Sequence, residues 1–170
     1  MTNPALFQDD ANDDSGVGGA EANDIKQGPI GNCYFLSALS IMCGCRELDL
    51  VPRLFVERRF FDRGLVGVKF FKNGKWWHVA VDTLIPTLDG RSPTFAKNTD
   101  INEWWLAIIE KAYAKMHGTY EVLDAGQMDE ALVDLTGGAP GSIDVKELFA
   151  ACKVGGRYDK KKALTVLTER

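Results

Sequence analysis

The sequence predicts an α+β domain that is mainly helical, and three observations support this fold class. Cys33–Met42 is apolar almost all round, as expected of a helix buried inside a domain. Leu65–Phe71 and Trp76–Val81 are rich in β-branched and aromatic residues, and Asn73-Gly74 between them predicts a two-residue hairpin turn. Glu103–His117 carries apolar residues at helical spacing. A central buried helix and a small antiparallel hairpin are therefore the expected elements.

Start and stop signals support the helices. Gly31-Asn32 offers a start for the first helix, and Gly44 ends it. Asn102 is a good cap for the second helix, the longest one expected, and Gly118 supplies its stop.

The last third of the chain also has helical patterns. A short helix is expected at Gln127–Leu135, closed by Gly137-Gly138. Two further helical patterns follow, at Asp144–Cys152 and Lys160–Glu169. No internal repeat or low-complexity tract interrupts the chain, so the sequence indicates one domain.

Composition narrows the function class. The 170 residues are 45% hydrophobic and 26% charged with a net charge of −4, and the lack of a basic run argues against a nucleic-acid binder. No apolar stretch approaches the roughly 20 residues needed to cross a bilayer, and no signal peptide is present. The chain is predicted to be cytoplasmic and intracellular, with free thiols.

Residues 1–15 are acidic and predicted to be a mobile arm, and residues 16–170 form the domain.

Gln27–Ala38 resembles the nucleophile motif of the calpains, in which a Gln precedes a Gly, an acidic residue, Cys, Trp and an apolar helix. Three more stretches follow in the order of that family: Gly74–Pro86, Glu103–Lys115 and Gly118–Gly138. The resemblance runs from about Val17 to the C-terminus. It implies a papain-like calpain protease core, of which this chain holds the first subdomain, whereas the second subdomain, with the catalytic His and Asn, is absent.

Cys33 is the candidate nucleophile. A thiolate attacks peptide carbonyls, and a Cys in the first turn of a helix has its anion favoured by the helix dipole. The resemblance implies that Gln27 stabilises the oxyanion. Two positions depart from the family pattern: Asn32 replaces the usual Asp but is expected to keep a capping side chain, and Tyr34 replaces Trp. The alternative is a structural Cys buried at a helix start.

The general base is missing from the predicted site. His78 and His117 match no catalytic position of the family, and both are predicted to be structural. A zinc module built on Cys43, Cys45 and Cys152 is disfavoured, because a single Cys-x-Cys is a poor knuckle. The isolated chain is thus predicted to be an inactive half of a calcium-dependent cysteine endopeptidase that cleaves intracellular proteins. The alternative is a non-catalytic interaction or regulatory domain with the calpain fold.

The resemblance also implies a regulatory calcium site. Its ligands would be the backbone carbonyls of Val17 and Gly19 and the carboxylates of Asp24 and Glu103. Oxygen donors of this kind suit calcium, a hard cation that takes six to eight of them. The alternative is that the two acids are an ordinary loop carboxylate and a helix N-terminal acid. The expected partners are protein substrates and the second protease subdomain.

Overall fold

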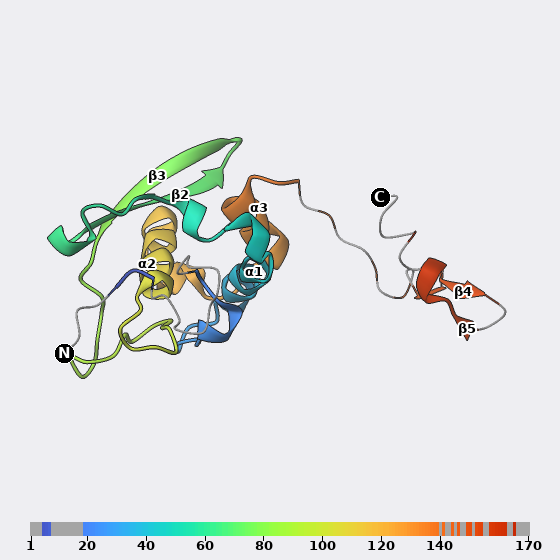
Figure 1. The fold of residues 1–170 in the computed structure, drawn as a ribbon, viewed down its shortest axis with the longest axis horizontal. Coiled ribbons are helices and arrows are strands. Elements are labelled where there is room, and N and C mark those ends of the chain that lie inside the picture. The colour runs from blue at the N-terminus through green and yellow to red at the C-terminus, as the bar shows by residue number, and fades with distance from the viewer. Residues whose placement is uncertain are drawn as a thin grey trace. The chain divides into compact units, whose positions relative to one another are not determined.

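The computed structural model describes residues 5–7 and 19–139, and in the remainder residues 141, 144, 146, 149–150, 152–154, 157–162 and 165 (Figure 1). The chain divides into two compact units, Met1–Ala139 and Pro140–Arg170. The three-stranded sheet and the helices α1, α2 and α3 belong to the first unit. Within the described residues, no helix is both long enough and apolar enough to cross a membrane.

The predicted first helix is confirmed as α1 (Cys33–Gly44). It lies in the core, with Phe35, Ala38 and Leu39 fully buried. The expected side-chain cap is wrong, because the Asn32 side chain makes no capping hydrogen bond. Only its carbonyl takes part, accepting from the N–H groups of Phe35 and Leu36, while its amide turns into the interior.

The predicted hairpin is confirmed as β2 (Leu65–Lys72) and β3 (Lys75–Asp82), which pair antiparallel over their full length. Asn73 and Gly74 both have positive φ, as a two-residue hairpin turn requires. A third strand, β1 (Phe55–Glu57), was not predicted, and it pairs with β2 through an irregular register. A three-residue strand is too short to show the alternation by which strands are recognised.

The inner face of the sheet is apolar and carries the helices. β2 directs its buried residues Val66, Val68 and Phe70 to this face, and Val81 of β3 lies opposite Val66. The helix α2 (Trp105–His117) packs against β3 and β2, and α3 (Met128–Thr136) packs against β2 and α1 (Figure 1).

The helix α2 begins two residues later than predicted, at Trp105. Asn102 does not cap it. Instead, the side-chain oxygen of Asn98 accepts from the N–H of Leu106 at 3.2 Å, inside the first turn. Glu103 lies before the helix, in a backbone bridge with Ala5.

That bridge is made by the N-terminal segment Ala5–Phe7. The Ala5 N–H donates to the Asn102 carbonyl at 2.8 Å, and the Ala5 carbonyl accepts from the Trp104 N–H at 3.1 Å. The Phe7 ring packs edge-on against Phe55 with centroids 5.2 Å apart. These three residues of the expected N-terminal arm are thus docked on the domain, and the rest of residues 1–15 lies outside the described residues.

Two lysines of α2 bind backbone carbonyls along the edge of β3 that faces away from β2. Lys115 Nζ donates to the Ala80 carbonyl at 2.8 Å. Lys111 Nζ donates to the carbonyls of Asp82 and Leu84 at 3.1 and 2.6 Å. Ala80 and Asp82 are two residues apart and so present their carbonyls on the same side of the strand.

The described residues also contain five single 3₁₀ turns: Ala22–Asp24, Arg46–Leu48, Pro52–Leu54, Phe61–Arg63 and Glu121–Leu123. In the second unit, Lys153–Val154 (β4) pairs antiparallel with Arg157–Tyr158 (β5), which was not predicted. The helices expected at Asp144–Cys152 and Lys160–Glu169 fall largely outside the described residues.

Candidate active site

Cys33 is the first residue of α1, and its side chain is exposed. Although the residues after it turn into the core, the thiol stays at the surface where the helix begins. The N-terminus of a helix presents free N–H groups and the positive end of the dipole, which favour an anion. The local fold therefore places an exposed thiol at the N-terminus of a helix.

The other cysteines differ from Cys33. Among the described thiols, Cys43 and Cys152 are buried and only Cys45 shares the exposure of Cys33. Burial, and next the negative charge of Asp24, raise the pKa of Cys43 to about 12. Cys43 is thus an inert core residue at neutral pH.

The loop before Cys33 is packed against residues 95–99. Lys26 and Lys97 exchange two backbone hydrogen bonds of 3.0 Å. Two residues later Gly28 meets the backbone of Phe95 so closely that a Cβ would lie 2.5 Å from the Phe95 carbonyl carbon. Only glycine fits this approach.

Residues 124–126 hold the loop on both sides of Cys33. The Gly31 N–H donates to Asp124 Oδ1 at 2.8 Å, and the Gly31 carbonyl accepts from the Ala125 N–H at 3.1 Å. On the other side, the Tyr34 ring lies against Gly126, where a Cβ would overlap it. The position of Cys33 is therefore fixed by contacts distant in sequence.

Gln27 lies in the same loop, with its side chain exposed. Its Nε2 donates to the Ile30 carbonyl at 2.8 Å and closes the turn that leads into α1. The structure thus brings Gln27 and Cys33 into one loop–helix junction.

A buried polar pair lies at the residue before Cys33. Asn32 is fully buried, and its Nδ2 donates to Glu110 Oε1 of α2 at 2.6 Å. Glu110 Oε2 accepts from the Ala96 N–H at 2.8 Å. Burial raises the pKa of Glu110 to about 7, although the hydrogen bonds from Asn32 and Ala96 act against the rise. Glu110 was not predicted as a site residue, although an acid within the apolar stretch of a helix is a signal for one.

Residues 8–168 match the family model described as calpain family cysteine protease. The chain belongs to the calpain family. It is 37% identical over 147 residues to "Calpain-type cysteine protease DEK1" of Arabidopsis thaliana and 40% identical over 129 residues to the protein of that name in Zea mays. It is 37% identical over 138 residues to "Calpain-5" of Caenorhabditis elegans.

These alignments cover 86%, 76% and 78% of this calpain-family chain but only 6%, 6% and 21% of the respective relatives. The chain therefore spans a small part of the curated calpains it matches.

Neither histidine of this calpain-family chain lies in the loop before Cys33. His78 is exposed on β3, and His117 ends α2. His117 Nε2 is 3.6 Å from Asp134 Oδ2, and its ring packs against Tyr113. His117 is thus part of a polar cluster around Asp134.

That cluster joins three elements. Asp134 of α3 is 3% exposed and accepts from the Tyr113 hydroxyl at 2.9 Å and from Lys72 Nζ at 2.7 Å. Burial tends to raise the pKa of Asp134, but the contacts with His117, Lys72 and Tyr113 outweigh burial and lower it. Tyr113 in turn stacks on Phe35 of α1 at 4.1 Å.

Of the predicted calcium ligands, Val17 lies outside the described residues, and Gly19, Asp24 and Glu103 lie within them. Asp24 accepts from a backbone N–H of its own turn, and the mostly buried Glu103 accepts from a neighbouring amide at 2.9 Å. Both carboxylates help to raise the pKa of Cys43, which lies near the C-terminal end of α1. No group of three or more His, Cys, Asp or Glu residues in the described part of the chain is arranged to hold a metal. Backbone carbonyls would have to complete such a site.

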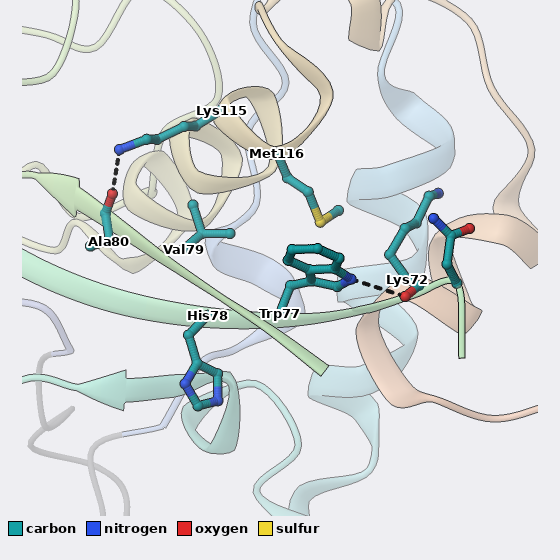
Figure 2. Close-up of a pocket in the computed structure, with 8 residues that line it drawn as sticks. Lys72, Trp77, His78, Val79, Ala80, Lys115 and Met116 are labelled. Atoms are coloured by element: carbon teal, nitrogen blue, oxygen red, sulfur yellow. Dashed lines mark hydrogen bonds between the residues drawn. The ribbon is translucent and has the colours of Figure 1, made fainter. Parts of the chain in front are cut away.

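A hollow of about 480 Å³ lies at the hairpin (Figure 2). Figure 2 shows the Trp77 ring between β3 and Met116 of α2, while His78 points away from that helix. None of the predicted catalytic residues lines this hollow. The residues that line it are Lys72, Asn73, Trp77, His78, Val79, Ala80, Lys115 and Met116.

Proposed function

We propose that this chain is the nucleophile-bearing half of a calpain-type cysteine endopeptidase, with Cys33 as the nucleophile. The observation that carries the proposal is an exposed thiol at the first residue of a buried helix, in a loop held by residues 95–99 and 124–126. A nucleophile needs this combination of exposure and fixed position.

In the proposed reaction, the Cys33 thiolate attacks the carbonyl carbon of a peptide bond. The new C–S bond leaves a tetrahedral oxyanion, and its collapse breaks the C–N bond and releases the amine, which takes up a proton. Water then hydrolyses the thioester and restores the thiol. The Cys33 backbone N–H and one N–H of the Gln27 side-chain amide stabilise the oxyanion. That amide has two N–H groups, and the other one donates to the Ile30 carbonyl.

The proton-transferring His and its Asn partner are proposed to come from a second subdomain. The match of residues 8–168 to the calpain family model supports this division, because the calpain resemblance places the catalytic His and Asn in a second subdomain. The 170-residue chain is then inactive by itself and cleaves protein substrates only when joined to that subdomain.

The thiol assignment is tested by alkylation of the intact chain. Cys33 is expected to react with iodoacetamide at neutral pH about tenfold faster than Cys45, which is exposed but lies at the opposite end of α1. Mass spectrometry of the two cysteine peptides measures both rates in one sample. The variants Cys33→Ser and Cys45→Ser assign each signal. Equal rates would favour the alternative, a non-catalytic domain with the calpain fold.

Calcium is proposed as a regulatory ligand of Val17, Gly19, Asp24 and Glu103. The donor set fits a hard cation, since it combines two carboxylates with two backbone carbonyls, and calcium accepts both kinds of oxygen as ligands. Bound calcium would supply positive charge that ties the loop before Cys33 to the start of α2.

Calcium is therefore expected to raise the melting temperature of the chain, and Asp24→Asn or Glu103→Gln should remove the rise. The exposed Glu47 lies outside this set, so Glu47→Gln should keep it. Thermal unfolding with calcium or with chelator measures the difference for each protein. The calcium proposal fails if the rise is the same in all four proteins or absent from the parent chain.

A further inference from the structure

Glu110 is buried without a counter-ion. It is 1% exposed, and no Lys, Arg or His among the described residues pairs with it. Asp134 is buried to a similar degree but contacts Lys72. A buried carboxylate without a cation is unfavourable, and a group in this position takes up a proton instead.

A proton on Glu110 needs an acceptor, and Asn32 offers one. The Asn32 Oδ1 atom is buried and has no hydrogen-bond partner within the described part of the chain. The other end of the same amide lies 2.6 Å from Glu110 Oε1, which is shorter than a usual N–H···O bond and typical of O–H···O. A half-turn of the amide exchanges Oδ1 and Nδ2 and places Oδ1 at this short contact.

We propose that Glu110 is a positioning residue. It is protonated in the folded protein and donates a hydrogen bond to Asn32 Oδ1. The neutral Asn32–Glu110 pair then anchors the start of α1 at the residue before Cys33. Glu110 Oε2 continues to accept from the Ala96 N–H, so one side chain fixes both the nucleophile loop and the segment packed against it. The pKa of Glu110, raised by burial, agrees with this arrangement.

The pair also links Cys33 to pH, and this part rests on the function proposed above. Ionisation of Glu110 places a negative charge near Cys33 and opposes the thiolate. The ionisable groups on the surrounding segments include Tyr120, whose pKa is raised by burial and next by Glu110. They also include Asp124 on the far side of Gly31, and Lys97, whose Nζ binds Ser92. None of them neutralises the carboxylate.

Infrared spectroscopy of the 170-residue chain tests the proton directly. A protonated carboxyl band should persist at about pH 6, where ordinary carboxyl groups are ionised, and disappear by about pH 8. Glu110→Gln should lack this band, while the exposed Glu130→Gln should retain it. Absence of the band from the parent chain overturns the proposal, whatever the variants do.

The effect on Cys33 is tested by its alkylation rate. Glutamine mimics the protonated acid, because it offers one acceptor to Ala96 and one donor to Asn32. Glu110→Gln should therefore alkylate at Cys33 about two- to tenfold faster than the parent above pH 7 and at a similar rate below it. Coincident rate profiles overturn the link to Cys33. An unreactive Cys33 in a chain that shows the band contradicts the proposed function and supports the proton assignment.

Discussion

Replacement of Asp134 by alanine is expected to lower the free energy of unfolding by about 3–5 kcal/mol at neutral pH. The substitution leaves the buried Tyr113 hydroxyl and the Lys72 ammonium without their shared acceptor. Urea denaturation followed by circular dichroism measures the loss. Glu130→Ala, an exposed change in the same helix, is the matched control and should cost less than about 1 kcal/mol.

The contribution of Asp134 should depend on pH in a defined direction. Because its pKa is lower in the folded than in the unfolded protein, its stabilisation is present above the unfolded pKa and is lost as pH falls through the folded pKa. The parent chain and Asp134→Asn should therefore converge in stability in acid. A gap that persists at low pH would show that packing, rather than charge, stabilises the cluster.

The second large effect is expected for Gly28→Ala. Its Cβ would lie 2.5 Å from the Phe95 carbonyl carbon, and because a backbone atom is the neighbour, the loop must move. The expected cost is about 1–3 kcal/mol, together with slower alkylation of Cys33. Both effects arise because this loop leads directly into α1.

Gly44→Ala provides the matched control for this change. A Cβ at Gly44 meets nothing within 4 Å, and the residue lies in the same helix as Cys33. Its substitution should leave Cys33 alkylation unchanged and stabilise the chain by up to about 1 kcal/mol. If the two alanine variants behave alike, the close approach at Gly28 has no influence on the reactivity of Cys33.

The elements predicted correctly from the sequence are those with local signals. The apolar run of α1 and the Asn73-Gly74 turn are sufficient by themselves to define a helix and a hairpin. The start of α2 was misplaced because Asn98 caps it and Ala5 pairs beside Glu103, and these contacts depend on the tertiary fold.

The candidate site shows the same difference between residues with a local signal and residues held by distant contacts. Cys33 and Gln27 were found because they lie in one short motif, and their catalytic roles stay predictions. The residues that hold this motif were missed, since Glu110 is 78 residues from Asn32 and Asp124 is 93 residues from Gly31. Hydrogen bonds over such separations leave no pattern in a single sequence.

The two lysines along β3 bear on how this chain behaves in a crowded solution. β3 has a strand partner on one side only among the described residues, and an open strand edge is a template for aggregation with other chains. Lys111 and Lys115 occupy carbonyls on that edge; Lys115 places a positive charge beside it, and Lys111 forms an ion pair there with Asp82 at 2.6 Å. They act as gatekeepers, so a modification that neutralises both would favour self-association through the sheet while leaving the core intact.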